Sequence, residues 1–286
     1  MIFKIKATIP AGQYANLQPE IEVDAPTFDE AYAQAMAHIQ KVWDEYGEKP
    51  LVSNVQAPGA TIDDFVSITP FVGEPFLYSD SRHEYKDGKA LLSGSSFAHQ
   101  FTKPFNKDMI LPKFATKHGV SEKEIEDMWK TKAEVSTTFG TAIHKALEFY
   151  GNHHQTITKT QGTFDIHPVL MPIVKSFFDA NPGHALHEIF VRSGDRVGQI
   201  DRLVITAPKT CIIEDWKTNG DLNKGTGKML TPYESLPDTP LSHYRLQLSF
   251  YKKIMEENGW KVEGIRLHHF TGKWETISLQ EVRIEN

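Results

Sequence analysis

The chain of 286 residues contains a single cysteine, Cys211. One cysteine cannot form a disulfide within the chain, and it excludes a cysteine zinc site or an iron–sulfur cluster held by this chain alone. No apolar run approaches the roughly 18 to 20 residues that a membrane-spanning helix needs. The first residues also lack the basic and apolar segments of a signal peptide. We therefore expect a cytoplasmic protein with no membrane partner.

Positively charged residues are fewer than negatively charged ones. Lys and Arg total 31 against 37 Asp and Glu, which gives a net charge of −6. Such a chain presents no overall positive field, so a nucleic-acid partner would have to be met by a local basic groove. The sequence has no internal repeat and no low-complexity tract. Its length and its 40% hydrophobic content are ordinary for a globular protein with one large domain or two unequal ones.

The patterns along the chain divide it into two parts. Residues 1–75 are expected to form a small β-β-α domain followed by a linker, and 76–286 a larger domain. In the first part, two alternating segments predict paired strands. Thr27 and Glu30 have the spacing of a capping box that begins a helix reaching about residue 46. Residues 50–75 contain several Pro and Gly and little periodicity, which predicts an irregular linker.

The larger part has the pattern of a mixed α/β (α+β) domain, with a central mixed sheet flanked by helices. Asp87-Gly88 predicts a hairpin turn, and Ser121 with Glu124 predicts a helix start. Hydrophobic periodicity predicts the later elements. The expected helices are 137–150, 168–178 and 241–258, and the expected strands are 185–193, 196–206, 210–217, 262–270 and 273–279.

Two of these strands contain acids among core-forming residues. Alternation places Asp215 and Lys217 on one face of their strand, about 7 Å apart. If the strands pair, Asp201 lies within reach of both. Taken alone, an Asp-x-Lys pair is often an exposed ion pair that contributes well under about 1 kcal/mol. The neighbouring residues predict interior strands, however, where a carboxylate is costly unless a metal or a cation balances it. The arrangement is that of a site for a hard divalent cation.

A glycine and a histidine share a face of the predicted helix 137–150. His144 lies four residues after Gly140, which would let a backbone or DNA approach closely, and it could be a metal ligand or a phosphate contact. A partly buried histidine bonded to Glu148 is the simpler alternative. Similarly, Gly198 predicts a bulge or a close approach three residues before Asp201.

Other candidates are weaker. Gln247 and Tyr251 share a face of the helix that follows the acid-bearing strands, although solvation explains such a pair equally well. Glu188 could be a further acid of the site or an exposed strand residue. The doublet His268-His269 is a poor zinc motif without cysteine. A final group would stack bases and contact phosphates, or simply form a basic solvated face: Lys103, Lys107, Lys113 and Lys117 with Phe101, Phe105 and Phe114.

Taken together, four motifs in order resemble the PD-(D/E)XK nuclease superfamily in its RecB-like branch, over roughly residues 80–280. The motifs are Gly140…His144, Gly198…Asp201, Asp215-Trp216-Lys217 and Gln247…Tyr251. The helix–three strands–helix–strand order is also similar, and it implies a restriction-endonuclease-like αβββαβ core. The lead-in around residues 83–96 resembles phage exonucleases related to the mitochondrial genome-maintenance exonuclease.

The resemblance implies a role for each motif residue. Asp201, Asp215 and the main-chain carbonyl of Trp216 would bind one or two Mg²⁺ or Mn²⁺ ions, with His144 as an additional ligand. Lys217 would orient or deprotonate the attacking water and stabilise charge in the transition state. The lone cysteine excludes the iron–sulfur subtype.

Gln247 and Tyr251 would position the scissile phosphate or the lysine. The resemblance therefore implies a metal-dependent DNA nuclease, more in keeping with an exonuclease than an endonuclease, acting on single strands or duplex ends in recombination, repair or replication. The N-terminal domain, which has no place in the nuclease core, could contact a recombination or single-strand-binding protein. An alternative function also remains: a non-cleaving DNA-binding or recombination-accessory module that keeps the nuclease fold.

Overall fold

The computed structural model describes residues 2–10, 16–17, 20–24, 27, 30, 34, 51–56, 65–159, 165–225 and 227–285. The chain separates into two units, Met1–Asp64 and Phe65–Asn286. The second unit thus begins at Phe65 rather than at residue 76. The reason is that β5 (Val66–Ile68) pairs with β6 (Phe76–Ser79), so part of the expected linker belongs to a sheet.

The first unit contains a small antiparallel sheet. Its strands are β1 (Ile2–Pro10), β2 (Asn16–Leu17), β3 (Glu20–Asp24) and β4 (Leu51–Gln56), and β1 pairs with each of the others. The two predicted strands are confirmed as β1 and β3, whereas β4 falls where an irregular segment was expected. The Glu30 amide donates to Thr27 Oγ1 at 3.4 Å, as a capping box requires. The rest of that predicted helix lies largely outside the described residues.

A second antiparallel sheet opens the larger unit. Strands β5, β6, β7 (Glu84–Asp87) and β8 (Lys89–Ala90) follow one another in space as in sequence. Asp87 pairs with Lys89 around Gly88, whose φ of 65° is the left-handed conformation that a tight turn needs. The predicted hairpin turn is confirmed.

The helices of this unit are α2 (Gly94–His99), α3 (Lys107–His118), α4 (Glu122–Lys159), α5 (Met171–Ala180) and α6 (Pro240–Glu257). Glu124 accepts from the Ser121 amide at 2.8 Å, and Ser121 Oγ accepts from the Glu124 amide at 3.2 Å, which confirms the capping box. The prediction of a separate helix over 137–150 is wrong, because α4 runs on without a break. It contains no proline, and a glycine inside a helix costs only about 1 kcal/mol.

The main sheet is mixed and flanked by helices, as expected. Its strands are β9 (Leu92–Ser93), β10 (Ala185–Ser193), β11 (Arg196–Ala207), β12 (Thr210–Lys217), β13 (Lys261–Phe270) and β14 (Trp274–Leu279). The order is β10-β11-β12-β13-β14, and β9 pairs with the start of β11. Only β12–β13, joined through α6, and β9–β11 are parallel. The five predicted strands of this region agree with the structure to within one residue.

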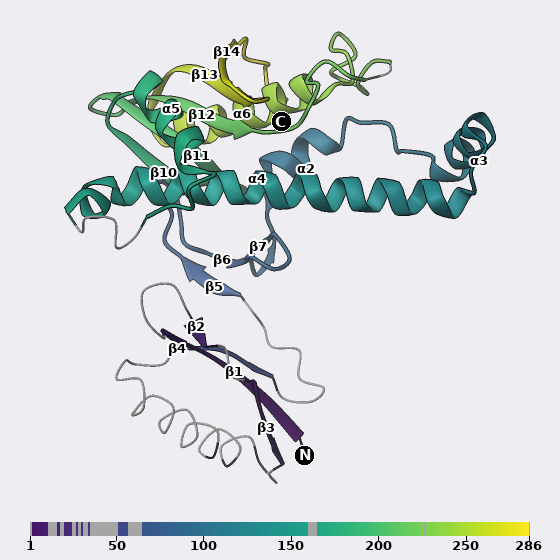
Figure 1. The fold of residues 1–286 in the computed structure, drawn as a ribbon. Helices are drawn as coiled ribbons and strands as arrows, with labels where there is room; N and C mark the ends of the chain where they lie inside the picture. The colour runs from purple at the N-terminus through teal and green to yellow at the C-terminus, as the bar shows by residue number, and fades with distance from the viewer. Residues whose placement is uncertain are drawn as a thin grey trace. The chain divides into compact units, whose positions relative to one another are not determined.

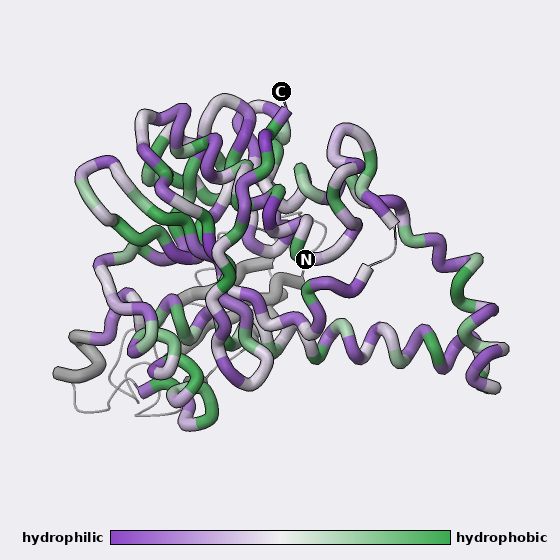
Figure 2. Tube along the Cα trace, turned by 90° about the horizontal axis from the view of Figure 1, so that it is seen from above, coloured by the Kyte–Doolittle hydropathy of each residue, from purple (hydrophilic) through white to green (hydrophobic). Residues whose placement is uncertain are grey.

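Helices cover both faces of this sheet. On one face, α6 and α2 bury a core that includes Phe97, Ile213, Leu246 and Phe250. On the other, α4 and α5 pack around Trp216. Figure 1 shows α4 running along the sheet and continuing beyond it to α3. In Figure 2 the hydrophobic segments gather in the body of this unit, whereas hydrophilic and hydrophobic residues alternate along the projecting part of α4. Among the described helices, none is long and apolar enough to cross a membrane.

Candidate metal centre

The candidate centre lies where β11 and β12 separate. Their pairing runs from the connecting turn as far as Arg202 opposite Glu214, and the start of β11 pairs with β9 instead. Beyond that point the Trp216 amide donates to Asp201 Oδ2 at 2.9 Å. The Asp201 carboxylate thus takes the place of a main-chain acceptor, which fixes it between the two strands.

Glu188 lies on β10 between His187 and Ile189, which pair with Arg202 and Ile200 on either side of Asp201, and it has a φ of 51°. This left-handed conformation is unfavourable for a residue with a side chain, and such strain is concentrated at functional sites. Ile200 and Leu203 lie three residues apart on β11, before and after Asp201 and Arg202, and pack in the same core, although strict alternation would place them on opposite faces. Strand β11 therefore changes face here, and the carboxylates of Asp201 and Glu188 both lie beside His144 of α4.

His144 on α4 completes this group. Its Nε2 lies 2.8 Å from the carbonyl oxygen of Trp216, and its Nδ1 lies 3.5 Å from Asp201 Oδ2 and 3.9 Å from Glu188 Oε1. We assign the proton to Nε2 because the carbonyl can only accept, so the lone pair on Nδ1 faces the two acids. Burial lowers the pKa of His144, which favours the neutral imidazole that metal binding requires. The alternative, a histidine bonded to Glu148, is not what the structure shows: His144 contacts the Trp216 carbonyl and the two acids, and Glu148 accepts from Lys145 at 2.9 Å.

Asp215 and Lys217 extend the group along β12. The Lys217 Nζ lies 2.5 Å from Asp215 Oδ2, so the predicted same-face pair is confirmed, and Asp215 is buried rather than exposed. Burial and the neighbouring Asp201 raise the pKa of Asp215 to about 7. Burial alone would lower the pKa of Lys217, but Asp215 and Asp201 hold it above its usual range. The lysine also lies 5.0 Å from the ring centroid of Tyr244.

The ligand atoms of His144, Glu188 and Asp201 all lie within 4.8 Å of one another. Burial, followed by the charges of Asp201 and Glu148, raises the pKa of Glu188 to about 9. Three ionised carboxylates (Glu188, Asp201 and Asp215) and one ammonium group would sum to −3 + 1 = −2, which a divalent cation balances. The cluster can therefore hold a metal ion, and its excess of acid gives a physical reason for one.

Trp216 contributes through its main chain. Its side chain is fully buried in the core around α4 and α5, and it packs edge-on to Phe177 with 5.7 Å between ring centroids. The side chain points away from Asp215, as alternation along β12 predicts. Its carbonyl oxygen accepts from His144, which leaves one lone pair of that oxygen for a further partner.

Gln247 and Tyr251 share a face of α6, as predicted, and the Gln247 amide donates to the Tyr251 hydroxyl at 3.0 Å. The Tyr251 ring fills space that two glycines leave free. A Cβ at Gly198 would lie 2.2 Å from Tyr251 Cε1, and a Cβ at Gly94 would lie 2.5 Å from the same atom. The close approach expected at Gly198 is thus made by a tyrosine ring. At Gly140 the neighbour is Thr218, whose Oγ1 would lie 3.0 Å from a Cβ.

The remaining candidates lie outside this centre. His268 contacts Glu214 Oε2 at 3.0 Å, whereas His269 contacts the Asn219 carbonyl, so the doublet does not form a shared site. The basic and aromatic group does not occupy one helical face, because α3 begins only at Lys107. Two of its aromatic residues, Phe105 and Phe114, pack against Trp129 at 5.8 and 5.9 Å between centroids.

Comparison with known proteins adds little. No protein-family model matches the chain, and no curated protein matches it. A solved structure described as "Crystal structure of SSO0001" aligns with 14% identity over 49% of this chain and 66% of its own, at a TM-score of 0.23. The chain therefore spans just under two thirds of that protein. A likeness this low supports no argument about fold or function, so the case for function depends on the site itself.

Proposed function

We propose that the protein is a metal-dependent DNA nuclease that hydrolyses phosphodiester bonds. The observation that carries the proposal is the meeting of Glu188, Asp201, Asp215 and Lys217 with His144 where β11 and β12 separate. On this proposal the elements α4, β10 to β12, α6 and β13 are a restriction-endonuclease-like core of the PD-(D/E)XK type in its RecB-like branch, with α5 inserted before β10. The motif order supports it.

The ion proposed is Mg²⁺ or Mn²⁺, one or two per site. Carboxylate oxygens predominate in the cluster, and hard cations prefer oxygen ligands. The single imidazole is available through Nδ1, because Nε2 is engaged with the Trp216 carbonyl. When bound, such an ion would act as a Lewis acid on the phosphate and activate water for attack.

Lys217 is proposed as the residue that stabilises negative charge on the phosphate. Its ion pair with Asp215 keeps it protonated at neutral pH, so it acts as a cation rather than as a proton acceptor. Tyr244 packs near the ammonium group and limits where it can move. Asp215 thus has two functions, because it would contact the metal and also orients the lysine.

Gln247 and Tyr251 are proposed to position the scissile phosphate. The Tyr251 hydroxyl accepts a hydrogen bond from Gln247, so its proton is free to donate to a phosphate oxygen. Burial raises the pKa of Tyr251 well above its ordinary value, which keeps the phenol a donor. Because its ring packs on Gly94 and Gly198, the hydroxyl is held in place.

The substrate proposed is DNA, at single strands or duplex ends, and digestion from an end is favoured by the resemblance of the motifs. The test uses end-labelled single- and double-stranded DNA with Mg²⁺ or Mn²⁺. We expect cleavage by the wild type and a loss of at least about 1,000-fold in Asp215→Asn and Lys217→Ala, which remove charges that act on the reacting phosphate. Gel analysis with label at either end also reports polarity.

The matched control is Glu214→Asp, which changes the neighbouring acid on the other face of β12 but keeps its charge. Cleavage at the wild-type rate by purified Asp215→Asn would contradict the assignment of this centre as the site of cleavage. Binding of DNA by the wild type without any cleavage, in either metal, would instead favour a non-cleaving accessory module.

A further inference from the structure

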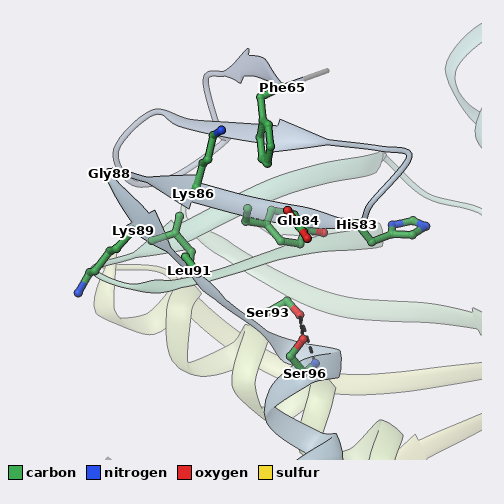
Figure 3. A pocket seen from close by; sticks show the side chains of 11 residues that line it. Phe65, His83, Glu84, Lys86, Gly88, Lys89, Leu91, Ser93 and Ser96 are labelled. Carbon is green, nitrogen blue, oxygen red and sulfur yellow. Dashed lines mark hydrogen bonds between the residues drawn. The ribbon is translucent and has the colours of Figure 1, made fainter. Parts of the chain in front are cut away.

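A pocket of about 400 Å³ lies beside the β7–β8 hairpin. Figure 3 shows Phe65 and Lys86 on one side of it and Ser93 and Ser96 on the other. We call it the hairpin pocket; it is lined by Phe65, His83, Glu84, Tyr85, Lys86, Gly88, Lys89, Ala90, Leu91, Ser93 and Ser96. None of these residues belongs to the candidate metal centre.

The charge of the hairpin pocket is opposite to that of the metal centre. Lys86 and Lys89 supply two positive charges against one negative charge from Glu84, so the lining sums to +2 − 1 = +1 with His83 neutral. The neighbouring acid Asp87 is turned away and pairs with Arg192 at 2.7 Å. In a chain with a net charge of −6, such a cavity is a local site for an anion.

The other groups of the pocket fit a phosphate. At the start of α2, Ser93 Oγ donates to Ser96 Oγ at 2.9 Å, so the Ser96 hydroxyl keeps its own proton for a further acceptor. Lys86 Nζ lies 3.4 Å from the ring centroid of Phe65, a cation–π contact that holds the ammonium group at the wall of the cavity. Ammonium and hydroxyl groups together are donors for phosphate oxygens.

Elements that line the hairpin pocket also contact elements of the metal centre. Ser93 pairs with Val197 at the start of β11, the strand that carries Asp201. The next residue, Gly94, packs against the ring of Tyr251. On the hairpin side, Tyr85 lies near enough to Glu188 for that carboxylate to contribute to raising its pKa to about 12, after burial and Asp80.

We propose that the hairpin pocket binds a backbone phosphate of the same DNA strand that is cut at the metal centre. This inference rests on the proposed function. The metal centre carries excess negative charge and repels a polyanion, so a strand must be held by cations nearby before an ion compensates the acids. Lys86 and Lys89 provide that attraction, and the Ser96 hydroxyl, which accepts from Ser93, orients the phosphate.

The test measures binding of a fluorescently labelled single-stranded oligonucleotide by anisotropy in EDTA, where cleavage cannot occur. We expect Lys86→Gln/Lys89→Gln to weaken binding about tenfold. The slope of log affinity against log salt should fall by about 0.7 to 1.4, because each lost phosphate contact on a single strand removes about 0.7. Lys89→Arg should bind like the wild type, and Lys273→Gln, a matched lysine in the exposed β13–β14 turn, should leave affinity and slope unchanged.

Unchanged affinity and salt slope in the double variant would overturn the inference. Micromolar binding of inorganic phosphate that depends on the two lysines, without an effect on DNA affinity, would also overturn it and assign the pocket to a free anion. Since Lys86 packs on Phe65, thermal melting checks the fold, and Lys89→Gln alone should weaken binding about threefold. The proposed function is tested separately by cleavage in Asp215→Asn. If the wild type does not cut DNA but the double variant loses binding, the proposed nuclease function is wrong, whereas the proposed phosphate site in the hairpin pocket is supported.

Discussion

Two groups of buried acids in the main sheet, one around Glu214 and one around Asp201, are balanced by cations to different degrees. Glu214 is 1% exposed and pairs with Arg202, which is 2% exposed, with Arg266 at 3.2 Å and with His268 at 3.0 Å. In the candidate metal centre, Asp215 and Asp201 share Lys217, and Glu188 lies beside Asp201. Neighbouring residues on the same strands thus form a compensated network and an acidic centre short of cations.

The pKa values reflect this difference. Burial raises the pKa of Glu214, but His268 and Arg202 outweigh it and leave the value below its usual range. At Asp215, burial and the charge of Asp201 outweigh the opposing effect of Lys217, and the pKa rises to about 7. A buried acid surrounded by cations stabilises the fold as a charge, whereas one beside other acids is stable as a charge only with an added cation.

The largest effect on the fold is expected for Glu214→Gln. Neutralising this carboxylate leaves Arg202 buried without its partner, which typically costs about 3–5 kcal/mol of unfolding free energy. Urea denaturation followed by circular dichroism measures it. Glu263→Gln, at an exposed pair with Thr206 and Lys261, should change stability by less than about 0.5 kcal/mol. A loss below about 1 kcal/mol in Glu214→Gln would contradict the comparison.

A divalent cation should stabilise the folded protein through the acidic centre around Asp201. At a Mn²⁺ concentration 100 times its dissociation constant, we expect about 2.7 kcal/mol of added unfolding free energy. Thermal melts with and without Mn²⁺ measure this effect. The shift should vanish in Asp201→Asn and persist in Glu214→Gln, which alters only the compensated network around Glu214. An equal shift in Asp201→Asn and in the wild type would place the ion elsewhere.

The smallest effect, and one of opposite sign, is expected for Asp215→Asn without metal. The folded pKa of about 7 lies above the unfolded value of 3.8, so the contribution of Asp215 to stability is fully present below pH 4 and is lost as pH rises through 7. The asparagine variant lacks this loss and should be more stable at pH 8, by about 1 kcal/mol or more. Denaturation at pH 4 and 8 checks the sign. A variant that is less stable at pH 8 would show that ionised Asp215 already has sufficient partners.

Much of the fold follows from local patterns. The period of alternation located β10 to β14 and α6 within one residue, because strand faces and helix stripes depend on neighbours along the chain. The Ser121–Glu124 box and the Asp87-Gly88 turn are equally local. The wrong predictions concern segments whose structure is not determined by neighbouring residues along the chain. A glycine without a proline did not end α4, and strands β4 and β5 are short segments specified by their partners.

The candidate site, too, could be predicted only in part from the sequence. The sequence by itself determined that Asp215 and Lys217 share one strand face and that Gln247 and Tyr251 share one helix face, since both relations lie within a single element. Only the tertiary structure decided that Glu188 joins the acids, that Asp201 holds the Trp216 amide, and that Tyr251 fills the space at Gly198. These contacts depend on where paired strands diverge and change face, which is a property of the assembled sheet.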